Sequence, residues 1–214
     1  MAIGRPSEAG VQVAVFAKAP IAGLVKTRLA AALGPAGAAR LQRSLTLRAL
    51  STARAASVGP VSLWCAPDKA HRFFRALRTA CALPCHDQQG NGLGERMRNC
   101  FRQLLPVGPS LLIGTDCPEL NATRLCAAAD ALYHVDAFLH PALDGGYVLL
   151  GLRRLDPLLF EGIRWGTDSV MRETRTRLAA LGWSWAEGET LQDIDEIGDL
   201  VHLPDELKPR FSHL

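Results

Sequence analysis

The sequence lacks several features that would assign it to whole classes of protein. No run of about 18 apolar residues occurs in the 214-residue chain, so no membrane-spanning helix is expected. The N-terminal segment MAIGRPSEAG has no apolar stretch of the kind found in signal peptides, so we expect a cytoplasmic protein. No internal repeat, low-complexity tract or linker is visible. We therefore expect a single domain over residues 11–214, after a flexible tail at 1–10.

Charge of one sign is also scarce, because 24 lysines and arginines nearly balance 21 acidic residues to give a net charge of +3. A nucleic-acid-binding protein would need a clustered basic face, so no nucleic-acid partner is expected. The six cysteines form no paired C-x-x-C motifs, which argues against a zinc knuckle. In a reducing compartment they are expected to stay free thiols. The oligomeric state stays open, a homodimer included.

What the chain does contain is a regular alternation of strand-like and helix-like segments, with 48% apolar residues to build a core. The alternation predicts an α/β fold of three layers, αβα, with a mostly parallel sheet and helices on both faces. Strands are expected at 11–17, 60–65, within 83–90, and at 110–115, 135–142, 145–152 and 183–187; helices are expected at 34–57, 66–80, 93–105, 122–134, 167–182 and 196–203.

The segment FAKAPIAGLVKTRL directly follows the first expected strand and carries Lys18, Lys26 and Arg28. Such a loop lies at the carboxyl edge of a parallel sheet, where α/β proteins bind ligands. Neighbouring cations repel each other, and Gly23 permits a tight return of the chain, so the loop is predicted to bind an anionic group. The alternative is that Lys26 and Arg28 are both solvent-exposed and pair with acidic residues elsewhere. Replacing either is expected to weaken nucleotide binding without lowering stability.

Aspartates follow two of the expected strands. Asp116 follows the apolar run LLIGT. A carboxylate there can bind a divalent cation, whose coordination shell is completed by water and substrate phosphates. It could equally cap the next turn. Asp144 precedes Gly145 and Gly146, which let backbone approach a ligand closely, although Asp-Gly is also common in hairpin turns.

Two further motifs are weaker. Asp193 and Asp195 alternate, so on a strand they would share a face and repel each other unless a cation lay between them. Asp195 could also cap a following helix. Gly90, Gly92 and Gly94 open a helix whose free N–H groups could hold an anion. Together these cations, glycines and carboxylates could hold a nucleotide diphosphate through a metal ion.

Six segments, in this order, resemble the bacterial DUF2064 family of small GT-A-type glycosyltransferase-like proteins, one branch of which is associated with arsenosugar biosynthesis. They are FAKAPIAGLVKTRLAAALG, QGNGLGERM, GTDCPEL, PALDGGYVLLGL, IRWGTDSV and DIDEIGDL. A more distant similarity extends to the molybdenum-cofactor and 2-phospho-lactate guanylyltransferases. The resemblance implies a nucleotide-diphospho-sugar transferase (GT-A) fold, a nucleotide or nucleotide sugar as the small-molecule partner, and Mg²⁺ or Mn²⁺ as the cofactor.

The motifs and the resemblance together predict a role for individual residues. Asp144 and Asp116 are the expected catalytic residues, and Asp144 would take the proton of the acceptor. One departure lies next to these motifs, since Glu196 and Ile197 replace the Thr-Pro that the family usually has after DID. The residues expected to bind the phosphates are Lys18, Gly23, Lys26, Arg28, Gly90 and Gly94. The expected metal ligands are Asp116, Asp193 and Asp195. The residues expected to contact the substrate are Gly145, Gly146, Tyr147 and Trp165.

The expected activity is the transfer of a sugar from a nucleotide-diphospho-sugar donor, with the metal and the basic loop neutralising the leaving diphosphate. Two other functions remain open. A nucleotidyltransferase would attack the α-phosphorus of a nucleoside triphosphate and release pyrophosphate. A non-catalytic nucleotide-binding protein could also use this fold. Glycosyl transfer and nucleotidyl transfer need the same electrostatic groups, so the sequence does not separate these two reactions.

Overall fold

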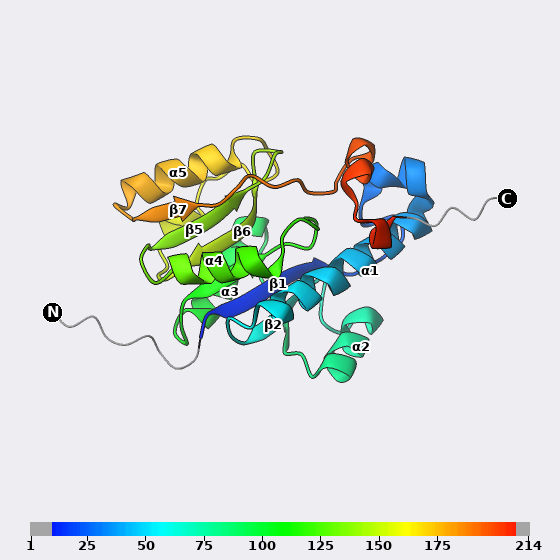
Figure 1. Cartoon of the computed structure of the whole chain (residues 1–214), viewed down its shortest axis with the longest axis horizontal. Coiled ribbons are helices and arrows are strands. Elements are labelled where there is room, and N and C mark those ends of the chain that lie inside the picture. Colours follow the sequence, from blue (N-terminus) through cyan, green and yellow to red (C-terminus); the bar gives the residue numbers. More distant parts are fainter. Residues whose placement is uncertain (1–9, 209–214) are drawn as a thin grey trace.

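The computed structural model describes residues 10–208 and contains a seven-stranded sheet covered by helices on both faces (Figure 1). Only the last residue of the expected tail at 1–10 falls within this range. The strand order is β3-β2-β1-β4-β6-β5-β7, and β6 alone runs antiparallel to its neighbours. The predicted α/β fold with a mostly parallel sheet is confirmed. The strands are β1 (Gln12–Lys18), β2 (Val61–Ala66), β3 (Cys85–Asp87), β4 (Ser110–Ile113), β5 (Ala137–Pro141), β6 (Tyr147–Leu152) and β7 (Trp185–Glu187).

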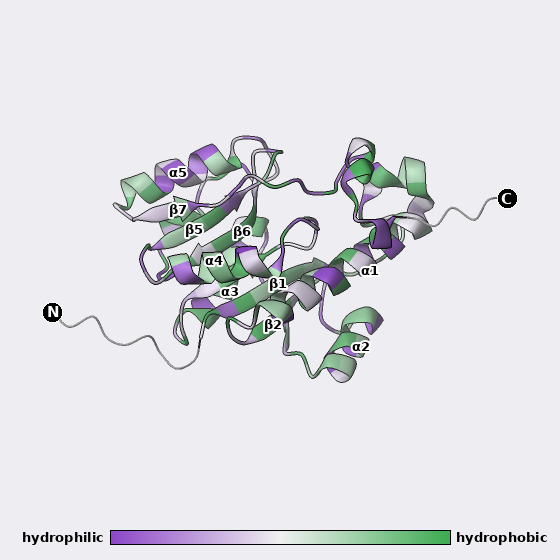
Figure 2. Ribbon diagram, in the orientation of Figure 1, coloured by the Kyte–Doolittle hydropathy of each residue, from purple (hydrophilic) through white to green (hydrophobic). Residues whose placement is uncertain are grey.

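Side chains point alternately to the two faces of the sheet along each strand, so a hydrophobic core forms on each face. In β1, Val13 and Val15 pack with one cluster, and Ala14 and Phe16 pack with the other, as a period of two requires. The central strands are accordingly mainly hydrophobic (Figure 2). The first face is covered by α1 (Ala30–Ala56), α2 (Arg72–Cys81) and α4 (Ala122–Ala131), and the second by α3 (Leu93–Leu104) and α5 (Val170–Ala180).

A third, smaller cluster joins the start of α1 to the C-terminal part of the described chain. Leu29, Leu41 and Leu45 pack there against Ile194 and Leu203. Figure 1 shows this contact as the red C-terminal segment lying against the blue start of α1. The cluster brings the DIDEIGDL segment next to the loop that follows β1. Four 3-10 helices complete the chain: η1 (Thr27–Leu29), η2 (Pro157–Leu159), η3 (Ile197–His202) and η4 (Asp205–Leu207).

Three of the expected helices differ most from those in the structure. The first helix begins at Ala30 and continues through a kink at Gly34 (φ 66°), where a residue without Cβ allows the turn. The second begins only at Arg72, because the His71 ring accepts a hydrogen bond from the Phe73 backbone N–H and caps it. The expected C-terminal helix is the 3-10 turn η3. None of its residues is buried, so little packing supports a longer helix.

Within residues 10–208, none of the helices combines the length and the apolar character that crossing a bilayer demands.

Candidate functional site

Lys26 lies at the centre of the polar groups that follow the strands. Its backbone is left-handed (φ 48°), and its side chain is only 2% exposed. The ammonium lies 2.9 Å from Oδ1 of Asp116 and 3.3 Å from Oδ1 of Asp195, and it donates to the Ile194 carbonyl. Because an ammonium has three donors, all of them are used here. Lys26 therefore joins the loop after β1, the end of β4 and the segment after β7.

Asp116 lies three residues beyond the end of β4, the central strand of the sheet, and its side chain is 46% exposed. The buried Thr115 hydroxyl lies 3.3 Å from Oδ1 of Asp116 and itself accepts a 3.0 Å hydrogen bond from the amide of buried Gln42. The Asp116 carbonyl accepts from the Ile194 N–H at 2.8 Å. These bonds hold Asp116 on the protein side and leave the other side of its carboxylate open.

Asp195 is engaged by cations on both of its oxygens. Lys26 contacts Oδ1, and Arg28, which is 68% exposed, lies 3.5 Å from Oδ2 and 3.2 Å from Glu196. The turn after Asp195 is capped by other residues, since the Asp199 carboxylate accepts from the N–H groups of Asp195 and Glu196 at 2.9 and 2.7 Å. Both Lys26 and Arg28 pair with acidic residues, but only Arg28 is solvent-exposed as the alternative expected, and their contact with phosphates stays a prediction.

Asp193 lies in the most crowded negative environment of the site. Burial raises its pKa to about 6, with further contributions from the charges of Asp144, Asp116 and Asp195. Asp193 and Asp144 line one cavity of about 160 Å³, which we call the carboxylate cavity. A cation placed among these carboxylates would relieve their mutual repulsion.

Asp144 and the two glycines after it form the turn between β5 and β6. Oδ1 of Asp144 accepts a 2.8 Å hydrogen bond from the Gly146 N–H, which leaves Oδ2 free. Gly145 has φ 87°, and a Cβ atom there would lie 2.3 Å from the Asp168 carbonyl oxygen. The close neighbour at this glycine is the backbone of Asp168, and the expected approach to a ligand stays a prediction.

Tyr147 and Trp165 form the aromatic wall of the carboxylate cavity, with their rings perpendicular and 6.4 Å apart. The Tyr147 hydroxyl contacts the sulfur of Met97 at 3.8 Å, and burial raises its pKa, so it is a poor proton acceptor at neutral pH. The ring of Trp165 packs so closely on α3 that a Cβ atom on Gly94 would lie 2.5 Å from the indole nitrogen.

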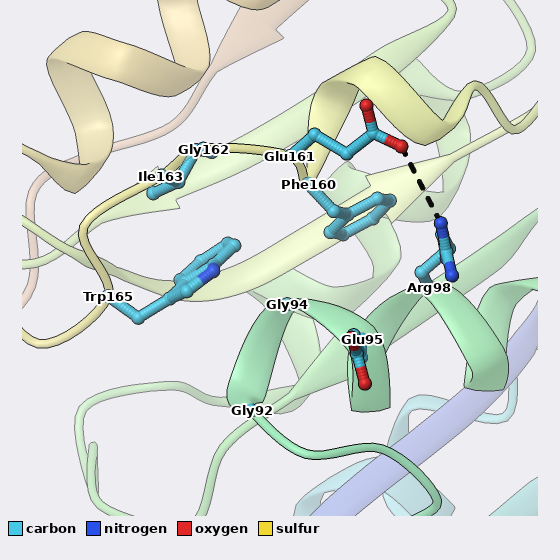
Figure 3. A pocket seen from close by; sticks show the side chains of 9 residues that line it. All are labelled: Gly92, Gly94, Glu95, Arg98, Phe160, Glu161, Gly162, Ile163 and Trp165. Carbon is cyan, nitrogen blue, oxygen red and sulfur yellow. Dashed lines mark ion pairs between the residues drawn. The ribbon is translucent and has the colours of Figure 1, made fainter.

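Trp165 also lines a second cavity of about 360 Å³ (Figure 3). Figure 3 shows Trp165 at one end of this cavity and, at the other end, the ion pair between Arg98 and Glu161, which are 3.7 Å apart; the Phe160 ring lies between them. Trp165 is thus the wall that the two cavities share.

The remaining predicted phosphate ligands lie outside the carboxylate group. Lys18 ends β1, is exposed, and has no ion-pair partner within residues 10–208. Gly23 forms a turn at φ 80° with open space around it. Gly90 is needed for packing, because a Cβ atom there would lie 2.7 Å from Cβ of Glu95, whose carboxylate accepts from the Asn91 N–H.

Sequence reasoning missed Gln42, Thr115 and Asp199, which hold the carboxylates in place. One signal was available for Gln42, since it is a lone amide on the apolar face of α1 and is 3% exposed. Cys117, next to Asp116, takes no part in such chemistry. Burial raises the pKa of its thiol to about 11, which suppresses the reactive thiolate.

The donor set suits a hard divalent cation. Within residues 10–208, Oδ2 of Asp116 and the Asp193 carboxylate have no side-chain partner, whereas both oxygens of Asp195 contact cations. Over the described range 10–208, no three His, Cys, Asp or Glu side chains already converge as a metal site. Mg²⁺ does not require such a cluster, because it binds one or two protein carboxylates and completes its shell with water and substrate phosphates.

Comparison with known proteins gives a family and a fold. The profile of a family described as an uncharacterized protein conserved in bacteria (DUF2064) matches residues 46–167. No curated protein matches the chain. A solved structure from Desulfovibrio desulfuricans G20, provisionally assigned as a nucleotide-diphospho-sugar transferase, is 29% identical with a TM-score of 0.84, and the match covers 94% of this chain and 89% of that one. The nucleotide-diphospho-sugar transferase fold implied by the sequence is confirmed.

Two more distant structures share the fold alone. The inositol-1-phosphate CTP transferase from T. maritima is 10% identical with a TM-score of 0.54, over 94% of this chain and 95% of that one. The Rv0371c protein from Mycobacterium tuberculosis H37Rv, in complex with manganese, is 15% identical with a TM-score of 0.55, over 91% and 97% of the two chains.

Proposed function

The chain belongs to the DUF2064 family, and we propose that it is a metal-dependent glycosyltransferase-like enzyme that transfers a sugar from a nucleotide-diphospho-sugar donor to an acceptor. The observation that carries the proposal is the group of Asp116, Asp144 and Asp193 at the carboxyl edge of the sheet, next to a cationic loop. The likeness to the Desulfovibrio protein supports the choice of donor.

Mg²⁺ or Mn²⁺ would be held by Asp116 and Asp193, which have free oxygens. When bound, the ion supplies positive charge to the diphosphate leaving group. Asp195 would act as a positioning residue, because it fixes Lys26 and Arg28. The manganese complex of a structure with this fold agrees with the choice of ion.

The donor phosphates would contact Lys18 and Arg28, whose side chains are exposed and therefore able to reach them. Lys26 would contribute its charge from below the site, since its three donors are already used by the protein. Gly23 has open space around it, so the absence of a side chain there would let the donor approach the backbone. Gly90 and Gly94 are packed against Glu95 and Trp165, so they would shape the neighbouring loop without contacting the donor themselves.

The acceptor would enter the carboxylate cavity, between Asp144 and the ring of Trp165. Oδ2 of Asp144 is the free oxygen that would take the proton of the acceptor hydroxyl as the new glycosidic bond forms. Gly145, Gly146 and Tyr147 shape the cavity wall, and the raised pKa of Tyr147 excludes it from that proton transfer.

Nucleotidyl transfer is the competing function, because a structure with this fold is a CTP transferase. The same cations would then hold the β- and γ-phosphates of a nucleoside triphosphate, and pyrophosphate would leave. Only the products separate the two reactions.

We predict that nucleotide sugars stabilise the protein only when Mn²⁺ is present. A ligand at a hundred times its Kd adds about 2.7 kcal/mol, or roughly 5–10 °C in Tm for a chain of this size. Asp116→Asn and Asp193→Asn should abolish this shift in a thermal-denaturation screen, whereas Asp130→Asn, an exposed change on α4, should keep it.

Folding defects are excluded by the same scans in EDTA. Asp193→Asn should then be at least as stable as the wild type, since it removes a charge from a repulsive group. Equal Mn²⁺-dependent shifts in all three variants would rule out these carboxylates as the metal site.

A further inference from the structure

One large hollow in the described part of the chain is not lined by any residue of the site above. It is a groove of about 690 Å³ between α1 and α2, closed at one end by the loop after β1. Figure 1 shows the two helices on the same side of the sheet, near the end of β1. We call it the α1–α2 groove. None of the predicted metal, phosphate or substrate ligands lines it.

The rim of the groove is strongly positive. Arg40 and Arg43 project from α1, three residues apart and therefore on one face, and Arg72 faces them from the start of α2 beside His71. No acidic residue lines the groove, and none lies in the first turn of α2. Within residues 10–208, these three arginines have no ion-pair or hydrogen-bond partner.

Single arginines without a partner also occur elsewhere among residues 10–208, such as Arg102 and Arg172, but at the groove three of them line one hollow. Most other arginines with contacts pair with a carboxylate, such as Arg48 with Glu206 and Arg175 with Glu187. Three unpaired guanidinium groups around one hollow repel each other, and an anion between them would remove that repulsion. The guanidinium fork fits the oxygens of a phosphate group particularly well.

The floor of the groove is apolar. Ile21 from the loop and Phe73 from α2 line it together with small residues, mostly alanines. Both side chains are partly exposed although they pack on the hydrophobic core, so a ligand could cover them further. A volume of about 690 Å³ also suits a small organic molecule, for which pockets of roughly 300–1,000 Å³ are usual.

We propose that the α1–α2 groove binds a small organic phosphate monoester whose body is aromatic or apolar. The phosphate group lies among Arg40, Arg43 and Arg72, and the body covers Ile21 and Phe73. The groove shares the loop after β1 with the proposed donor site but none of its predicted ligands, and the proposal does not depend on the proposed function.

Isothermal titration calorimetry with 1-naphthyl phosphate tests the proposal. We expect one binding site per chain, and at least about tenfold weaker binding in Arg43→Ala and in Arg72→Ala, as for the loss of a hydrogen bond to a charged group. Arg102→Ala, an exposed change on α3 across the sheet, should leave the affinity unchanged. Ala76→Trp, at an exposed position that lines the groove, should block binding without lowering Tm.

Two probes and one variant separate the alternatives. 1-Naphthol lacks the charge and inorganic phosphate lacks the body, so each should bind at least about tenfold more weakly than 1-naphthyl phosphate. Arg28→Ala should keep full affinity, which excludes binding at the loop beside Asp195. The proposal is overturned by unchanged affinity in both Arg43→Ala and Arg72→Ala, by equal binding of 1-naphthol, or by a Kd for 1-naphthyl phosphate above about 1 mM.

Discussion

At the scale of single residues, Lys26 and Arg28 have different roles although they are two positions apart. The Lys26 ammonium is buried and has three protein acceptors, whereas Arg28 pairs with acids at the surface. Replacing a buried cation costs much stability, because its carboxylate partners lose their counter-charge. An ion pair at the surface contributes little to stability. From the sequence alone, neither replacement is expected to lower stability. Because Lys26 is buried, we now expect its replacement to lower stability.

We predict that Lys26→Met lowers the free energy of unfolding by about 2 kcal/mol, below the range for a fully buried pair because Asp116 and Asp195 are about half exposed. Arg28→Ala, the matched change in the same loop, should lower it by less than about 1 kcal/mol. Urea denaturation at neutral pH measures both. Equal losses in the two variants would show that Lys26 is not the buried link between the loop and the acids.

The residue types of the site could be recognised from the sequence, but their partners could not. Asp116, Asp144 and Asp193 stand out because each follows a strand or a strand-like run. That Lys26 contacts Asp116 and Asp195 depends on the packing of Ile194 against α1, about 150 residues away along the chain. Alternation also suggested that Asp193 and Asp195 are equivalent, whereas the segment is not a strand and only Asp195 contacts cations.

At the scale of elements, the start of α3 shows why its glycines differ. Gly94 faces the ring of Trp165, and a Cβ atom there would lie 2.5 Å from the indole nitrogen. Gly92 caps the helix in an extended conformation (φ −144°) with nothing within 4 Å of a Cβ atom. The first glycine is required for packing, and the second is not.

We predict that Gly94→Ala displaces Trp165 and destabilises the protein by about 1–3 kcal/mol, as overpacking does. Gly92→Ala should change stability by less than about 1 kcal/mol, because only the cap is altered. Thermal denaturation measures stability, and tryptophan fluorescence should shift in Gly94→Ala alone. A Gly94→Ala variant as stable as the wild type would mean that α3 and Trp165 are not packed as described.

Helices and strands were predictable where periodicity is strong, as for α3, expected at 93–105 and found at Leu93–Leu104. Boundaries failed where a side chain or the backbone intervenes locally. His71 caps α2 five residues later than expected from the apolar pattern, and the kink at Gly34 extends α1 backwards. Such capping and kinks depend on local geometry, which apolar periodicity does not report.

At the scale of the whole molecule, the strand order brings the functional segments to one edge. β1, β4 and β5 run in the same direction, so the loops after them, with Lys26, Asp116 and Asp144, leave the sheet at the same side. The alternation of strands and helices predicted the mostly parallel sheet. It did not predict that β6 inserts between β4 and β5, because that order depends on contacts between distant segments.

The most direct test of the central claim is the identity of the nucleotide product. The protein is incubated with Mn²⁺ and a panel of nucleotide sugars, with water as the acceptor, or with nucleoside triphosphates and sugar phosphates, and the nucleotides and pyrophosphate are quantified. We predict Mn²⁺-dependent release of a nucleoside diphosphate from a nucleotide sugar, reduced at least about a hundredfold in Asp144→Asn, as for the loss of a general base, and unchanged in Asp130→Asn. Release of pyrophosphate from a nucleoside triphosphate, without nucleoside diphosphate from any nucleotide sugar, would contradict it.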